Sequence, residues 1–592
     1  MKKIVTICLS LFFCIGMLIG TSTDVFASTN SGFCGADARW SFDETTGTLT
    51  ISGTGDMYNS ENGSMSWSML YDKIVCVVIE DGITSICNKA FYEIKNLKEV
   101  SIPDSVTSIG KEAFARSGLT YIELPDSITY IDEQAFSSSQ LEEITIPSAV
   151  KELPFRVFSD CKNLKKVVLN DNLTCIGDYA FDKCSSLQTI TIPDSVTEIK
   201  PSAFEDCTKL SEIGIGKNVT SIPFACFRGC DNLKEIFIPD NVISLEQSAF
   251  ADCRSLEKVT LGAGVKEFDT TVFSDCTSLQ MFVVSPQSDT LANDEHGVLY
   301  SKDMKKLLLF PMAITGDYVV FDGTQVIGFR AGFQCKSLRE LVIPDSLMEI
   351  GDDAFYECVS LRSLDLGNGV QSIGGMAFYN CSALKTVIIP ASVTFIDVHA
   401  FGSTFDDPFE AISFLGNPPQ IDASSSIINT DEIWYPAGNI EWENNFPEKI
   451  NATSRHQGCE GSHNFVREEI VQPTCSQEGS TETVKCQTCG FTSVSGVAIP
   501  TIDHTYGKWE YITSADSASE QRQLKHTCTA CGHEETKFAD QLDASELPEE
   551  TSKDTPSDMG TIIFIVIGVV LVLAGVGVVN LLRAKKAKGD SL

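Results

Sequence analysis

Basic residues are scarce in this chain, which has 44 lysines and arginines against 80 aspartates and glutamates. The formal net charge is −36 and the isoelectric point is about 4.5. A surface of this sign repels nucleic acid phosphates and acidic lipid headgroups. We therefore expect no nucleic-acid partner, and the acidity suits solubility outside a cell.

Sequence motifs of catalysis are also missing. The chain has no Gly-x-Ser-x-Gly, no His-Glu-x-x-His and no phosphate-binding loop. His296 and His399 are single histidines in repeat context, where a structural role is the simpler interpretation. No window of the repeat region offers a helix of ten or more residues. These absences predict a mainly β protein that is not an enzyme, and a surface hydrolase is the least favoured function.

What the sequence does contain is a repeat. Phenylalanine occurs at positions 158, 181, 204, 227, 250 and 273, with a Cys three residues after each Phe and a Leu three after that. The period is 23 without slippage. A fixed period of about 20–30 residues is typical of a solenoid, in which each unit buries its apolar side against its neighbours.

The Phe rhythm continues at positions 91, 114 and 136 and at 333, 355, 378 and 401, which makes 13 units. In the unit 187–193, the leucine and isoleucines point inward while Thr189 and Thr191 point outward, by strand alternation. Pro193 then ends the strand. The predicted fold class is therefore mainly β: a leucine-rich repeat solenoid of about 13 coils with a 22–23-residue period, plus a small Cys/His-rich module and one transmembrane helix.

The repeat also predicts how the chain is divided. A basic start, an apolar run and a small-residue cleavage site predict a signal peptide. About 22 uncharged residues followed by Arg583 and lysines predict a membrane span with a cytoplasmic tail. The predicted segments are a signal peptide (1–27), an N-terminal β cap (28–80), the solenoid (81–402) with a hairpin insertion at about 285–325, a C-terminal cap (403–455), the Cys/His-rich module (456–540), an acidic linker (541–559), the transmembrane helix (560–582) and a cytoplasmic basic tail (583–592).

These segments predict an exported protein of the cell surface, held in the cell membrane by a single C-terminal span. The sequence Leu547-Pro548-Glu549-Glu550-Thr551 resembles a sortase signal, but it has one residue too many before the Thr and no following Gly. We therefore favour a retained anchor over sortase processing.

Nine cysteines occupy the repeat's Cys slot, where three early units carry Ile94, Ser117 and Ser139 instead. Export would permit disulfides. A ladder of thiols in one slot is better explained by small buried side chains, because free Cys packs like a compact apolar residue. We expect unpaired thiols there.

The Cys/His-rich module contains two matched Cys-x-x-Cys-Gly knuckles, at Cys486/Cys489 and Cys528/Cys531. Such a turn presents two thiolates at the spacing that a tetrahedral zinc ion requires. The candidate ligands are Cys475, Cys486, Cys489, Cys528, Cys531, His463, His504, His526 and His533. Structural zinc is favoured, and disulfides or free thiols are the alternatives. No cofactor is expected to be required. A redox enzyme is not expected, since no βαβ pattern accompanies the motifs.

The phrases Ile-Pro-Asp-Ser-Val-Thr-x-Ile and Ala-Phe-x-x-Cys-x-x-Leu resemble the BspA-like leucine-rich repeat family of bacterial surface proteins. The run 297–300 and the close 435–438 also resemble members from Gram-positive gut bacteria, and the resemblance covers about residues 33–445. It implies a surface-exposed repeat domain. It also implies protein partners, because some relatives bind host matrix proteins or other bacteria.

The outward strand positions are the candidate contact face. They are Glu99, Tyr121, Glu123, Glu143, Lys166, Glu212, Glu235, Phe237 and Lys258. Tyr121 and Phe237 are unusual there, because exposed aromatic residues on a repeat face favour protein contact. The favoured function is adhesion or protein–protein recognition through this face. A structural spacer or display stalk on the cell envelope is the alternative.

Overall fold

The computed structural model describes residues 30–59, 65–402, 409–421, 428–444, 446–448, 450–459, 463, 465–468, 479–480, 483–494, 498–499, 508, 510–511, 523–527 and 534–538. The chain divides into one unit of Met1–Glu469 with Glu482–Gly496 and a second unit of Ile470–Thr481 with Val497–Leu592. The predicted signal peptide, acidic linker and cytoplasmic basic tail lie outside the described residues.

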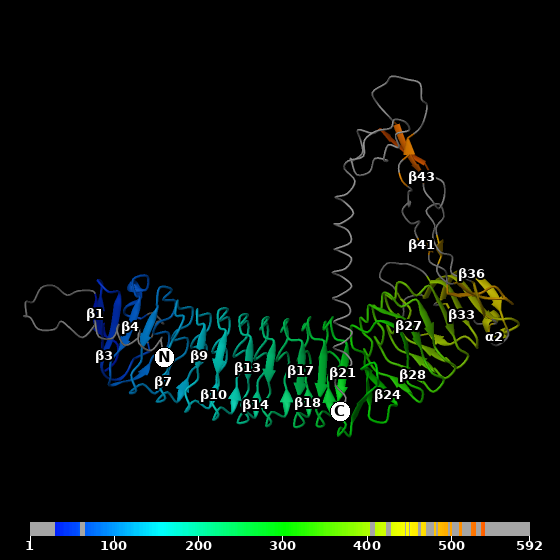
Figure 1. The fold of residues 1–592 in the computed structure, drawn as a ribbon. Helices are drawn as coiled ribbons and strands as arrows, with labels where there is room; N and C mark the ends of the chain where they lie inside the picture. The colour runs from blue at the N-terminus through cyan, green and yellow to red at the C-terminus, as the bar shows by residue number, and fades with distance from the viewer. Residues whose placement is uncertain are drawn as a thin grey trace, which may run out of the picture. The chain divides into compact units, whose positions relative to one another are not determined.

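Most coils of the first unit place one strand of about three to five residues in a parallel ladder (Figure 1). The coil that contains Tyr121 and Glu123 has no strand assigned at this position. We call this the long-strand ladder. Its members are β4 (Cys76–Ile79), β6 (Glu99–Ser101), β9 (Glu143–Thr145), β11 (Lys166–Val168), β13 (Thr189–Thr191), β15 (Glu212–Gly214), β17 (Glu235–Ile238), β19 (Lys258–Leu261), β21 (Met281–Val284), β25 (Gly316–Val319), β27 (Leu338–Val342), β29 (Ser363–Asp365) and β31 (Thr386–Ile389), followed by the longer β33 (Phe409–Phe414), β35 (Ile428–Pro436) and β36 (Ile450–Gly458).

A second parallel ladder follows the turn after each long strand, and most of its strands have two residues. We call it the short-strand ladder. Its members are β5 (Ile83–Ile86), β7 (Ser108–Ile109), β8 (Tyr130–Ile131), β10 (Glu152–Leu153), β12 (Cys175–Ile176), β14 (Glu198–Ile199), β16 (Ser221–Ile222), β18 (Ser244–Leu245), β20 (Glu267–Phe268), β24 (Lys306–Leu309), β26 (Val326–Ile327), β28 (Glu349–Ile350), β30 (Ser372–Ile373), β32 (Phe395–Ile396) and β34 (Gln420–Ile421).

The third side of each coil is the tight turn around the buried Phe. Non-glycine residues with positive φ recur two positions before and two after it, as at Lys89 (57°) and Glu93 (58°) around Phe91. This backbone region is unfavourable for such residues. The alternation lets the N–H groups of residues 89, 91 and 93 all donate to carbonyls of the next coil, at Lys111, Ala113 and Ala115. The turn thus forms a third hydrogen-bonded ladder that holds the coils together.

The interior is a continuous stack of aromatic rings and aliphatic side chains. From Phe114 to Phe273 the rings of successive coils lie 5.2–5.7 Å apart and nearly parallel. The buried residues of this interior form two clusters, 34–309 and 298–450, which meet at the insertion. The spacing is close to the distance of about 4.8 Å between neighbouring strands, so each regular coil adds one ring to the stack.

The predicted number of coils is wrong: the solenoid has about 16 turns rather than 13. Counting by Phe misses turns in which another residue takes that place. Trp67 lies in the slot before Phe91, with its ring 6.2 Å away, and Phe310 packs edge-on against Phe355 at 5.7 Å. Phe333, which we counted, is off by one position. Gly332 occupies the slot, because a Cβ there would lie 2.6 Å from the Phe355 ring.

The predicted transmembrane helix is also corrected. The helices among the described residues are η1 (Ser68–Leu70) and α2 (Ile440–Asn444). A span needs about 20 apolar helical residues, and no helix in the described part of the chain is long and apolar enough to cross a membrane. Residues 560–582 themselves lie outside that part.

The two ends and the insertion depart from the repeat. At the start, β1 (Ser31–Phe33), β2 (Asp37–Asp43) and β3 (Thr48–Asp56) form an antiparallel meander, and β3 then pairs parallel with β4. In the insertion, β22 (Leu291–Asn293) and β23 (Leu299–Ser301) pair antiparallel before β24 rejoins the ladder. Tyr318 there donates a 2.6 Å hydrogen bond to Asp294, and its hydroxyl lies 2.7 Å from that of Tyr300.

After β36, the first unit includes a small antiparallel sheet of β37 (Phe465–Glu468), β39 (Thr483–Cys486) and β40 (Thr492–Val494). The second unit contains the pair β38 (Gly479–Ser480) and β41 (Ala498–Ile499). It also contains a sheet of β42 (Glu510–Tyr511), β43 (Gln523–Thr527) and β44 (Glu534–Phe538).

Candidate recognition face and candidate metal centre

The outward side of the long-strand ladder shows strict alternation in the regular coils. On β13, Thr189 and Thr191 are exposed and Ile190 is buried. Of the nine predicted contact residues, Lys258 is half-buried and the other eight are exposed: Glu99, Tyr121, Glu123, Glu143, Lys166, Glu212, Glu235 and Phe237. The structure therefore places all nine side chains at least partly in solvent on one side of the coils.

Charges of opposite sign face each other between neighbouring strands of this side. Lys166 on β11 is in register with Glu143 on β9, and Lys258 on β19 is in register with Glu235 on β17. The Lys258 Nζ lies 4.0 Å from a Glu235 carboxylate oxygen. Exposed pairs of this kind contribute at most about 1 kcal/mol, so they leave both charges available to a partner.

Two exposed aromatic side chains lie on this side of the coils. Phe237 on β17 is 59% exposed and Tyr121 is 48% exposed. Exposed single hydrophobic residues are common on proteins. Tyrosine is, however, one of the residue types that carry most of the binding energy in protein interfaces, and phenylalanine is enriched in interfaces relative to the rest of the surface.

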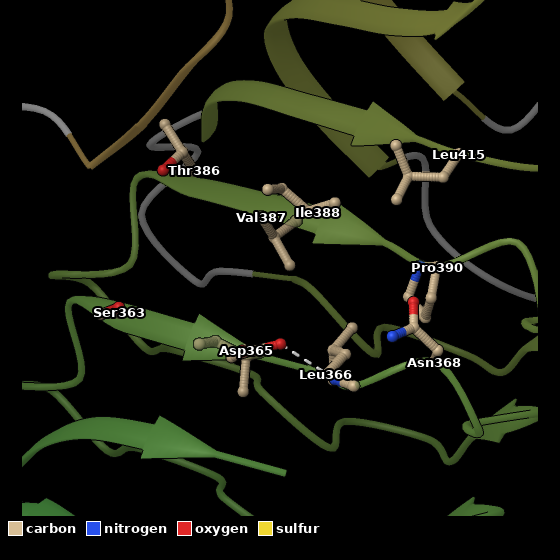
Figure 2. Close-up of a pocket in the computed structure, with 11 residues that line it drawn as sticks. Ser363, Asp365, Leu366, Asn368, Thr386, Val387, Ile388, Pro390 and Leu415 are labelled. Carbon is tan, nitrogen blue, oxygen red and sulfur yellow. Dashed lines mark hydrogen bonds between the residues drawn. The ribbon is translucent and has the colours of Figure 1, made fainter. Parts of the chain in front are cut away.

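A hollow interrupts the same ladder towards its C-terminal end. It has a volume of about 270 Å³ and lies between β29 and β31, which belong to separate sheets. Figure 2 shows Ser363 and Asp365 on β29 facing Thr386 and Ile388 on β31, with Leu415 at one end. The open face of the ladder therefore includes a notch at this point.

Beyond the hollow, the alternation fails. On β33 the outward residues Ala411 and Ser413 are only 5% and 1% exposed, although Ile412 and Phe414 fill the interior. What covers them is the segment around Cys486 and Phe491, which packs with Ala411 in a separate buried cluster. The last strands thus have a second layer on their outer side.

Four potential metal ligands meet at this second layer: Cys459, His463, Cys486 and Cys489. Their ligand atoms all lie within 4.8 Å of one another. The Cys459 and Cys486 sulfurs are 3.6 Å apart, and the Cys489 sulfur is 3.3 Å from Nδ1 of His463. Three thiols and one imidazole in this arrangement can hold a metal ion.

The local structure explains how each ligand is positioned. Cys459 directly follows β36, and Cys486 ends β39. The Cys486–Gly490 turn closes with a hydrogen bond from the Gly490 N–H to the Cys486 carbonyl, at 2.9 Å. Nε2 of His463 lies 2.9 Å from the Ser413 hydroxyl, so the imidazole is oriented from the solenoid side. A second partner of this kind is what orients metal-ligating histidines.

The cluster already favours a thiolate. Burial opposes ionisation of the Cys486 thiol, but hydrogen bonds from the backbone N–H groups of Cys489 and Thr488, together with the His463 and Cys459 side chains, lower its pKa to about 5. The thiolate is the form that ligates metals. Burial, and hydrogen bonds to the two neighbouring sulfurs, raise the pKa of Cys459 to about 12.

The structure brings together three of the predicted ligands, His463, Cys486 and Cys489, and adds Cys459, which the sequence analysis did not select. The spacing Cys459-x-x-x-His463 was a signal that could have identified it. His526 lies on β43, with Nε2 3.0 Å from a Glu535 carboxylate oxygen. Cys475, His504, Cys528, Cys531 and His533 lie outside the described residues.

The coils of paired strands, the aromatic stack and the outward sheet face define a leucine-rich repeat solenoid protein. Residues 70–173, 151–280 and 317–423 match the BspA type leucine rich repeat region, described as six copies. Together these matches cover more than half of the sequence. The chain therefore belongs to the BspA-type leucine-rich repeat family, as the resemblance predicted.

Solved structures similar to this chain include a leucine rich cell surface protein from Faecalibacterium prausnitzii, at 22% identity, 75% coverage of this chain, 100% of that chain and a TM-score of 0.41. A leucine-rich repeat protein from Bacteroides ovatus matches at 21% identity, with coverages of 71% and 99% and a TM-score of 0.40. The pneumococcal vaccine antigen PcpA matches at 17%, with coverages of 72% and 97% and a TM-score of 0.39. The comparison with curated proteins found no match.

Proposed function

We propose that this protein is exported to the cell surface and recognises other proteins through the open face of its long-strand ladder, in adhesion or protein–protein recognition. Membership of the BspA-type family supports this function, and the secretory character of residues 1–27 supports export. The observation that carries the proposal is Phe237, which is 59% exposed on the outward side of β17.

The test is binding of the purified full-length chain to a panel of extracellular matrix proteins and bacterial surfaces. We expect the double variant Tyr121→Ala/Phe237→Ala to lose at least tenfold in affinity for any partner that binds the native chain, as truncating two central aromatic contacts costs about 1–2 kcal/mol each. Tyr130→Ala is the matched control, because Tyr130 is 55% exposed but lies on the short-strand ladder. Equal losses in both variants, or no partner in the panel, would refute the proposal.

We also propose that the cluster of Cys459, His463, Cys486 and Cys489 holds a structural zinc ion. Tetrahedral zinc with bonds of about 2.3 Å to sulfur and 2.0–2.1 Å to nitrogen places its ligand atoms about 3.5–3.8 Å apart. The sulfur–sulfur distance of 3.6 Å lies within this range, and the sulfur–nitrogen distance of 3.3 Å is about 0.2 Å shorter than its lower end. Metal analysis of protein purified without chelator tests it, and a Cys459–Cys486 disulfide with no zinc would refute it.

A further inference from the structure

We propose that the zinc ion acts as a clasp: it fixes the β39–β40 hairpin over the outer face of β31, β33 and β35, and so sets where the open face of the solenoid ends. This inference rests on the zinc site proposed above and concerns what the metal controls. Without the metal, an apolar part of the ladder that is now covered would become accessible.

The buried outward residues are the first step of the argument. On β17 the outward residues Glu235 and Phe237 are exposed, as alternation requires. On β33 the residues at the equivalent outward positions, Ala411 and Ser413, are almost fully buried. A strand in a solenoid can bury both sides only if something packs on its outer side. The outer side of β33 is therefore a covered surface.

The covering layer is the hairpin that carries the metal ligands. Phe491 is fully buried, with its ring 5.0 Å from that of His463 and 6.0 Å from that of Trp434 on β35. Ile388 on β31 packs against the same cluster. The hairpin and the solenoid thus share one small apolar core, and the metal ligands lie at its edge.

This layer is too small to hold itself in place. Its strands β37, β39 and β40 have four, four and three residues. Small sheets of this kind have marginal stability in water unless a disulfide or a metal ion cross-links them. The cross-link available here joins the two layers, because Cys459 directly follows β36, the last solenoid strand, while Cys486 and Cys489 belong to the hairpin.

The Ser413 hydroxyl gives an independent sign of the same coupling. Ser413 lies on the outer side of β33 and is 1% exposed, and Nε2 of the candidate ligand His463 lies 2.9 Å from its hydroxyl oxygen. If the hairpin left, a buried hydroxyl and the faces of Ile388, Ala411 and Trp434 would be hydrated. These residues adjoin the hollow between β29 and β31, since Ile388 lines both (Figure 2). Zinc release would then extend the recognition face by an apolar patch.

The experiment uses the full-length chain and follows zinc content and the accessibility of Trp434 to acrylamide. The Trp434 signal is the difference between the native chain and a Trp434→Phe variant. Removing zinc with a chelator, or replacing a ligand by Cys459→Ser, is expected to raise the Trp434 quenching constant at least twofold. Readdition of Zn²⁺ should restore the low value in the native chain but not in Cys459→Ser. Cys76→Ser on β4, far along the solenoid from the cluster, is the matched control and should keep both zinc and protection.

The outcomes separate the two proposals. A native chain that contains no zinc overturns the metal site and the clasp together. Zinc that leaves on chelation while Trp434 stays protected overturns the clasp alone. Zinc retained in Cys459→Ser overturns the ligand set, and with it the link between β36 and the hairpin.

Discussion

At the scale of single residues, one contact recurs from coil to coil: a hydrogen bond from the thiol of the repeat's Cys slot to a carbonyl of the preceding coil. The Sγ–H of Cys207 donates to the carbonyl of Phe181 in the preceding coil at 3.2 Å, and Cys184 does the same to Phe158. These cysteines are free and buried, which confirms the expected ladder of unpaired thiols. The sequence showed that the slot takes a small side chain. It could not show the inter-coil hydrogen bond, because that depends on how coils stack.

The slot therefore predicts different costs for two substitutions. Cys207→Ala removes both the donor and the volume of the sulfur, and we expect a loss of about 1–2 kcal/mol in stability. Cys207→Ser keeps a donor of nearly the same shape, and we expect a loss below about 1 kcal/mol. Urea unfolding followed by circular dichroism measures both. A serine variant less stable than the alanine variant would contradict the donor role.

Burial of the thiols also predicts sensitivity to alkali. Desolvation raises the pKa of Cys161 to about 11 and that of Cys335 to about 12, from an ordinary 9.0. The folded state therefore holds these protons more tightly than the unfolded state. Its stability is full below about pH 9 and is lost as the pH rises towards 11. The thermal midpoint measured between about pH 8 and 11 should fall in the native chain and fall less in Cys161→Ser/Cys335→Ser. Parallel decreases in the two proteins would show that other groups are responsible.

At the scale of the element, the period predicted the strands well and the aromatic slot less well. Each inward and outward position of β13 and β17 follows from alternation. Phe333 was wrongly counted as a core residue because it lies one position after the aromatic slot. Its ring stacks on Tyr356 at 5.1 Å, in a second row of rings outside the core. What distinguishes the core row of rings from the outer row is that the Phe355 ring packs directly against Gly332, where a Cβ would not fit. This is a contact between neighbouring coils, which a local sequence pattern does not show.

Two substitutions test this assignment. Phe355→Ala empties a fully buried place between neighbouring rings, and we expect a loss of about 3–5 kcal/mol. Phe333→Ala removes a half-buried ring from the outer stack, and we expect a loss of about 0.5–1.5 kcal/mol. Thermal unfolding of the two variants provides the comparison. Equal losses would mean that both rings contribute to one core.

The candidate metal centre was predictable in part for a similar reason. The knuckle of Cys486 and Cys489 can be recognised in the sequence from its Cys-x-x-Cys spacing, because both ligands lie in one turn. Cys459 joins them only because β36 pairs with β35 and ends beside the hairpin. In the same way, alternation predicted an outward face on every strand, but not that the β39–β40 hairpin would cover its last part. Contacts between segments far apart in the sequence are what a local pattern cannot contain.

At the scale of the whole solenoid, each regular coil repeats the contacts of its neighbours. Strand pairs link residues one period apart, as Thr189 with Glu212 and Glu235 with Lys258. The hydrogen bonds of the tight turns and the thiol bonds reach only the adjacent coil. Stability of such an array is close to a sum over coils and their interfaces. The length of the ladder is therefore adjustable, while its register is not.

Removing one whole period should consequently leave the fold intact. Deletion of residues 182–204 joins Phe181 to Glu205 and returns Cys207 to the place three residues after the Phe. Every strand, ring and thiol then meets an equivalent partner from the next coil. We expect unchanged strand content by circular dichroism, a monomer of correspondingly smaller size and a thermal midpoint lowered by only a few degrees. Deletion of residues 182–192 is the control, because it joins Phe181 to Pro193 and turns inward residues outward. That variant should aggregate or unfold. If both deletions behave alike, the coils are not interchangeable units, and the additive account of this solenoid fails.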